Sequence, residues 1–150
     1  MPRHPRNPRR LVADGRAYLW TLRHSHRAPG DGGRGDCCAT VTLHPQPAGT
    51  GGPLRIVFTE GPGRYVGGAP LGSGDVGFVR GGSLNLHEPG AVRALLDEAA
   101  ARGWHPGERA AELDGWSLLE AAAAAQAGPA GATAPAAQAA PAATTGPAGR

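Results

Sequence analysis

Histidines and cysteines in the first third of the chain are the residues best suited to metal chemistry. His24 and His26 stand two positions apart, so they would share one face of an extended strand. His44, or the adjacent pair Cys37 and Cys38, would complete a zinc-binding set after strand pairing. No Cys-x-x-Cys or His-x₃-His spacing occurs, and solvated imidazoles at a strand end are the simpler interpretation. We expect no bound metal and keep His24, His26 and His44 as candidate ligands.

A glycine-rich segment matches the G-x-G-x-x-G letter pattern of dinucleotide-binding loops at residues 72–77. That pattern works when a helix follows directly, because the helix N-terminus faces the pyrophosphate. Here residues 78–82 continue as Phe-Val-Arg-Gly-Gly, and Asp97, about twenty residues on, falls inside an expected helix rather than at a strand end. We interpret residues 61–82 as a glycine-rich loop and expect no cofactor.

Other catalytic classes lack their required residues. All 15 basic residues are arginine, so neither a Schiff-base lysine nor a Walker phosphate loop is available. Ser73 and Ser83 lie among glycines but lack the flanking pattern of a nucleophile elbow. The acidic pair Asp97 and Glu98 falls on the polar face of an expected helix. The sequence therefore leans away from an enzyme, and we assign no catalytic residue.

Alternating apolar and polar positions predict a mostly antiparallel sheet. Asp14-Gly15 between two apolar stretches is typical of a hairpin with a type I′ turn, and Tyr18, Trp20 and Leu22 would share one face of its second strand. The expected strands cover residues 11–13, 16–23, 37–43 and 54–59, with a possible fifth at 76–79 or 83–86.

The clearest element is a helix over residues 89–102. Pro89 suits the first helical position, and an i, i+3, i+4, i+7 stripe predicts one buried face; the stripe consists of Val92, Leu95, Leu96 and Ala99. Gly103 stands where a left-handed cap is expected. Ser117 with Glu120 fits a capping box that would open a second helix, ending near Gly128.

These elements indicate an α+β fold: a mostly antiparallel sheet of four to five strands with one or two C-terminal helices packed on it. We expect three parts, namely a flexible Arg/Pro-rich arm (1–9), a single domain (10–127) and a disordered Ala/Pro-rich tail (128–150). No secretory signal or membrane span is expected, and Cys37 and Cys38 are interpreted as reduced thiols. A cytoplasmic location is the expectation.

Three stretches together, at residues 11–20, 54–58 and 89–104, resemble a family of small uncharacterised actinobacterial proteins. The resemblance covers roughly residues 10–120 and implies a layout with the hairpin first and the helix last. It implies no activity, and no catalytic residue is transferred from it.

Three functions remain open on this basis. The first is a non-catalytic module that binds another protein through Tyr18, Trp20 and Arg23 of the hairpin, or through the acidic helix face. The second is nucleic-acid association, because residues 1–27 carry seven arginines against Asp14 alone. The third is a metal protein or enzyme built around His24, His26 and the loop at 61–82.

Overall fold

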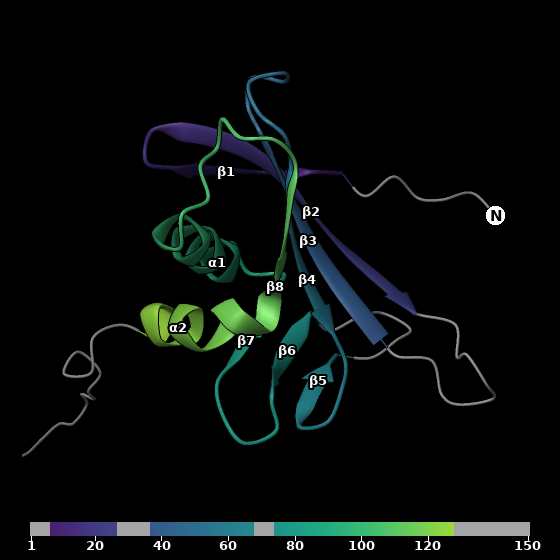
Figure 1. Ribbon diagram of the computed structural model, residues 1–150. Coiled ribbons are helices and arrows are strands. Elements are labelled where there is room, and N and C mark those ends of the chain that lie inside the picture. The colour runs from purple at the N-terminus through teal and green to yellow at the C-terminus, as the bar shows by residue number, and fades with distance from the viewer. Residues whose placement is uncertain (1–6, 27–36, 68–73, 128–150) are drawn as a thin grey trace, which may run out of the picture.

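The computed structural model describes residues 7–26, 37–67 and 74–127. A five-stranded sheet in the order β1-β2-β3-β4-β8 forms the larger layer, and a three-stranded antiparallel sheet, β5-β6-β7, lies at one end of it (Figure 1). Both helices pack on one side of the larger sheet. The α+β fold class is therefore confirmed.

The elements are β1 (Arg9–Ala13), β2 (Arg16–His26), β3 (Cys37–Pro45), β4 (Leu54–Thr59), β5 (Arg64–Val66), β6 (Asp75–Phe78), β7 (Ser83–Asn85), α1 (Pro89–Ala101), β8 (Ala111–Asp114) and α2 (Gly115–Ala127).

Strands β2, β3 and β4 form the antiparallel centre of the larger sheet, and their side chains alternate between two faces. One face is apolar and lies under the helices, while the other carries mainly polar side chains and no helix covers it among the described residues. The buried face consists of Tyr18, Trp20, Ala39, Val41, Leu43, Leu54, Ile56 and Phe58.

The β1–β2 hairpin closes as the sequence predicts. Asp14 and Gly15 have φ angles of 51° and 75°, which is the positive-φ pair of a type I′ turn. The strand begins earlier than expected, however, because Arg9 already pairs with Trp20. The boundary of the N-terminal arm is corrected accordingly, since Arg9 belongs to the sheet.

Residues 76–79 and 83–86 were expected as alternatives for one additional strand of a single sheet. Both segments instead contribute strands, β6 and β7, to a separate sheet that β5 completes. The larger sheet gains its fifth strand from β8, which runs parallel to β4. Strand β8 has only four residues, two of them acidic, and such a segment carries little β propensity of its own.

Helix α1 follows the expected pattern closely. Pro89 occupies its first turn, and all four residues of the expected stripe are buried. Gly103 has a φ of 105°, and the chain folds back so that the Trp104 amide donates to the Ala99 carbonyl. Trp104 then packs near Tyr18, with ring centroids 6.4 Å apart.

Helix α2 begins two residues before the expected capping serine. The Asp114 carboxylate accepts a hydrogen bond from the Trp116 amide at 3.2 Å, and the Ser117 hydroxyl donates to the Asp114 carbonyl at 2.7 Å. Asp114 therefore caps this helix, and the predicted capping box of Ser117 with Glu120 is wrong. The described part of this helix runs to Ala127, and its expected end near Gly128 lies outside the described residues.

Several expectations lie outside the described residues. They concern most of the N-terminal arm (1–6), the C-terminal tail (128–150) and the first part of the glycine motif, Gly72 and Ser73. Within the described part, Gly74–Gly77 leads into and through β6 rather than into a helix. Neither helix is long and apolar enough to cross a lipid bilayer.

Leu95 lies at the centre of the α1 stripe and is fully buried. We predict that Leu95→Ala lowers the free energy of unfolding by about 2–4 kcal/mol, because it leaves a cavity under the sheet. Arg93→Ala is the control on the same helix; its ion pairs with Asp97 and Asp14 are partly solvated, so their loss costs at most about 1 kcal/mol. Chemical denaturation measures both, and similar losses would show that the helix is oriented differently.

Candidate functional site

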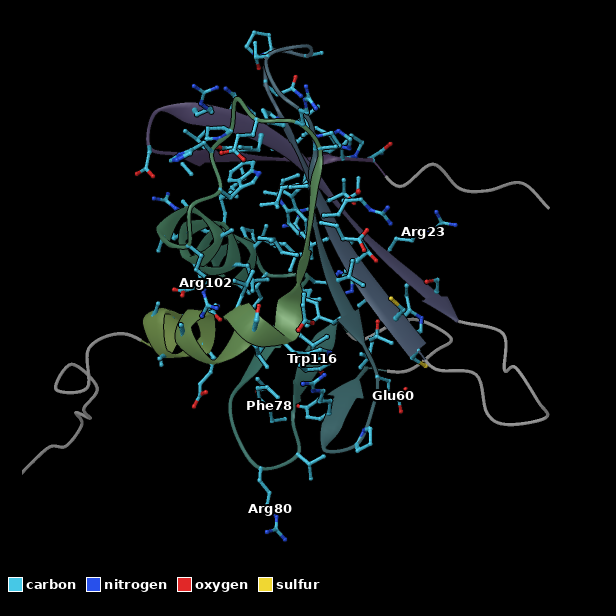
Figure 2. The ribbon with its side chains drawn as sticks, viewed as in Figure 1. Arg23, Glu60, Phe78, Arg80, Arg102 and Trp116 are labelled. Atoms are coloured by element: carbon cyan, nitrogen blue, oxygen red, sulfur yellow. The ribbon has the colours of Figure 1, made fainter. Side chains whose placement is uncertain are left out.

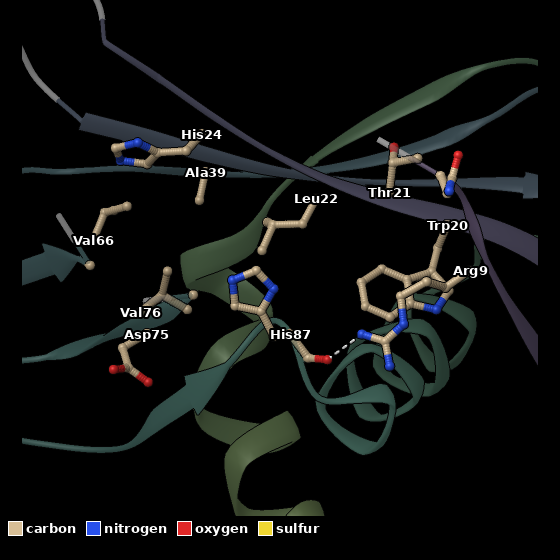
Figure 3. Close-up of a pocket in the computed structure, with 13 residues that line it drawn as sticks. Arg9, Trp20, Thr21, Leu22, His24, Ala39, Val66, Asp75, Val76 and His87 are labelled. Atoms are coloured by element: carbon tan, nitrogen blue, oxygen red, sulfur yellow. Dashed lines mark hydrogen bonds between the residues drawn. The ribbon is translucent and has the colours of Figure 1, made fainter. Parts of the chain in front are cut away.

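A cavity of about 320 Å³ opens where the two sheets meet (Figure 3). Its walls come from the start of β1, the far half of β2, the facing part of β3, the β5–β6 pair and the turn after β7. The lining residues are Asn7, Arg9, Trp20, Thr21, Leu22, His24, Ala39, Val66, Gly67, Gly74, Asp75, Val76 and His87. Ligand cavities in proteins typically measure about 300–1,000 Å³, so this one suits a small ligand.

Unequal element lengths create the cavity. Strand β2 has 11 residues and β3 has nine, whereas β1 has five and β4 has six. The far ends of β2 and β3 therefore extend beyond the part of the sheet that α1 covers, and the small sheet faces them there (Figure 1). Leu22, Ala39, Val66 and Val76 form the apolar walls of the space between.

Arg9 stands at one end of this cavity. Its guanidinium lies over the buried Trp20 ring, 4.8 Å from the ring centroid, and donates a hydrogen bond of 2.6 Å to the His87 carbonyl. No carboxylate of the described residues pairs with it. Beneath it, the Trp20 indole N–H has no hydrogen-bond acceptor within the described part of the chain. This end of the cavity thus concentrates hydrogen-bond donors and positive charge.

Hydrogen bonds on either side of His87 hold its backbone in place. The Asn85 side-chain oxygen accepts from the His87 amide at 2.9 Å, and the Leu86 amide donates to the Gly74 carbonyl at 2.7 Å. Gly74 has a φ of 80°, and a Cβ atom there would collide with the His87 ring. Only glycine lets the strand approach the imidazole this closely. Figure 3 shows that ring below Leu22, between Val76 and the Arg9–Trp20 pair.

Two further ionisable residues line the opposite end. His24 extends from β2 near Val66. Asp75 is the first residue of β6, and Val76 lies between it and Arg9 (Figure 3). Both take part in interactions within the protein, so neither is a free group. The cavity therefore has an apolar middle and a cationic end at Arg9, while the Asp75 carboxylate points away from it, on the side of β6 opposite Val76 (Figure 3).

The structure does not bring the candidate zinc ligands together. His24 pairs with Ala39 and His44 with Leu19, so the two histidines lie five positions apart along the same strand pair and on opposite faces. Completion of a zinc set by His44 is therefore wrong. The His26 backbone pairs with Cys37, but the side chain of His26 lies outside the described atoms. Within the described residues, no three His, Cys, Asp or Glu side chains form a metal-binding group.

The expected contact surface on the hairpin also needs correction. Tyr18 and Trp20 face α1 and the core, with only 4% and 1% of their surface exposed, because they share the apolar face of β2. Neither side chain can form an exposed contact surface. Arg23 is exposed, on the opposite face of the same strand. Trp20 instead contributes to the wall of the cavity.

Sequence reasoning missed Arg9, Asp75 and His87 as members of one site. They come from three separate segments, and Arg9 was assigned to the flexible arm. Strand-like alternation around Trp20 was visible, but no local pattern shows that β6 and the turn after β7 fold against it.

Comparisons with protein-family models, curated proteins and solved structures find no significant match to this chain. The resemblance to small actinobacterial proteins therefore stays a prediction. Any functional conclusion must come from the geometry of the site itself.

Gly74 offers a direct test of how the cavity is built. We predict that Gly74→Ala destabilises the protein by about 1–3 kcal/mol, because the positive φ and the contact with His87 both oppose a methyl group. Gly107→Ala is the matched control, since an added Cβ there meets no atom within 4 Å and its φ is ordinary. Thermal denaturation of both variants, with NMR of the His87 ring, checks this; an unperturbed His87 ring in Gly74→Ala would contradict the geometry.

The burial of Tyr18 has a consequence at alkaline pH. Desolvation raises the pKa of its phenol above the ordinary value of 10.0, although Arg16 partly opposes the change. The folded state therefore holds this proton more tightly than the unfolded state does. Stability should be unaffected below pH 10 and should decline as the pH rises above it.

Unfolding measured across this range should show a smaller alkaline decline in Tyr18→Phe, which has no phenol to ionise. Tyr65→Phe is the control, because Tyr65 is exposed. Equal alkaline declines in Tyr18→Phe and the unmodified protein would show that Tyr18 is solvated.

Proposed function

We propose that this protein is a non-catalytic binding module that holds a small, largely apolar group in the cavity between its two sheets. The observation that carries the proposal is the cavity itself, with apolar walls and a few polar groups converging on it. Its walls belong to strands rather than to loops alone, so the site is held in shape before a ligand arrives.

The residues around the cavity favour binding over catalysis. Within the described chain no serine or cysteine lines it, and the lining threonine, Thr21, alternates with Trp20 and Leu22 along β2, so its hydroxyl lies on the other face of the sheet. The groups able to move a proton are His24, Asp75 and His87. They come from three separate segments, and no serine, cysteine or lysine among the described lining residues stands beside them as a nucleophile.

The other functions suggested by the sequence have less support. The acidic residues on the exposed face of α1 carry their own counter-charges, because Asp97 pairs with Arg93 and Glu98 with Arg102. That helix face is therefore not an unpaired acidic surface for a protein partner. A protein partner at another surface, nucleic-acid association and a cytoplasmic location stay predictions.

The proposal can be tested with benzyl alcohol, a neutral probe whose ring matches the apolar walls. Saturation-transfer NMR should detect its binding to the full chain. Ala39→Leu should abolish that binding, because the longer side chain fills the cavity from β3. Thr42→Leu makes a similar change on the opposite face of the same strand and should leave binding intact.

Melting curves would first establish that both variants fold. Should folded Ala39→Leu bind the probe as well as Thr42→Leu does, the cavity is not the binding site. If the unmodified protein gives no signal at any accessible concentration, the proposed function fails.

A further inference from the structure

We infer that the natural ligand of this cavity is a small organic carboxylate: a compact apolar body with its anionic group held by Arg9. The inference rests on the proposed function and adds the chemical class of the ligand. It follows from the position of one guanidinium and from the apolar surface next to it.

Arg9 is set up to receive an anion. Its hydrogen bond to the His87 carbonyl and its stacking on Trp20 hold the guanidinium in place from two sides. A guanidinium presents five N–H donors, and within the described residues the His87 carbonyl is the one acceptor that it reaches. Remaining donors can bind a carboxylate in two parallel hydrogen bonds, the geometry for which arginine is best suited.

The charges nearby support the same assignment. A carboxylate beside Arg9 would meet no acidic side chain among the described residues that line that end of the cavity. The Trp20 N–H, which has no acceptor in the described part of the chain, lies under the same guanidinium. The guanidinium therefore fixes the orientation of the ligand, with its carboxylate at Arg9 and its apolar body pointing toward Val66 and Val76.

The size and lining of the cavity limit the rest of the ligand. A volume of about 320 Å³ leaves space for one ring or a short branched chain. Leu22, Val66 and Val76 offer that body an apolar contact surface, and burying it supplies most of the attraction. A cavity of this volume holds a small molecule whole, whereas the end of a protein chain would leave its preceding residues outside the cavity.

The test compares phenylacetate with phenylacetamide, which has the same ring and nearly the same shape but no charge. Isothermal titration calorimetry of the full chain should show about tenfold tighter binding of phenylacetate, the effect expected for a charge-assisted hydrogen bond at an exposed arginine. Arg9→Gln should remove this preference, and Arg9→Lys should restore part of it.

Arg10→Gln is the matched control. Arg10 is the next residue of β1 and is equally charged and exposed, but it pairs with Leu19 on the other face of the sheet. The preference for phenylacetate should survive this change. A non-specific attraction between the basic protein and any anion would instead fall by similar amounts in Arg9→Gln and Arg10→Gln, and the inference would be overturned.

The remaining outcomes separate the two proposals. Equal binding of phenylacetate and phenylacetamide at the cavity would contradict the carboxylate but leave the binding module standing. Binding of both ligands that Ala39→Leu leaves unchanged, or no binding of either ligand, would contradict the proposed function itself. Tighter binding of a tripeptide ending in phenylalanine than of phenylacetate would replace the small molecule with a protein C-terminus.

Discussion

The whole structure depends on the burial of one face of the β2–β3–β4 sheet. A shift of one residue in the pairing of these strands would exchange the apolar and polar faces, exposing Trp20, Leu43 and Phe58 together. That cost fixes the register, and the register fixes which residues α1 and α2 must cover. Burial of the large apolar side chains on this face, rather than the exposed ion pairs of α1, is the main source of stability.

The cavity follows from the same constraint. Strands β2 and β3 are long enough to extend past α1. The short β5-β6-β7 sheet packs over the apolar side chains at their far ends (Figure 1). Figure 2 shows Trp116, at the start of α2, next to Phe78 of β6; the Phe78 and Phe58 rings both pack on the Trp116 ring. This aromatic contact packs one side of the small sheet against α2 and β4. The space on the other side, beside Leu22 and His24, is the cavity.

Local patterns in the sequence were sufficient for much of the fold. The Asp14-Gly15 turn, the alternation in β3 and β4 and the α1 stripe each depend on neighbours within one or two turns of chain, so their signals are strong. Strand β8 escaped prediction because it exists only through its pairing with β4, more than fifty residues earlier. The site could not be predicted for the same reason. The contacts of Arg9 with Trp20 and with the His87 carbonyl join segments far apart in the sequence, and no local pattern indicates them.

The indole N–H resonances of the three tryptophans test the central claim most directly, because each reports on a different place in the core. Trp20 lines the cavity, Trp104 packs near Tyr18, and the Trp116 N–H donates to the Thr59 carbonyl at 2.9 Å. During a titration with phenylacetate, followed by ¹H–¹⁵N correlation spectra, the Trp20 signal should move to saturation while those of Trp104 and Trp116 stay in place. A saturable shift at Trp104 or Trp116 with Trp20 unchanged would contradict the placement of the binding site between the two sheets.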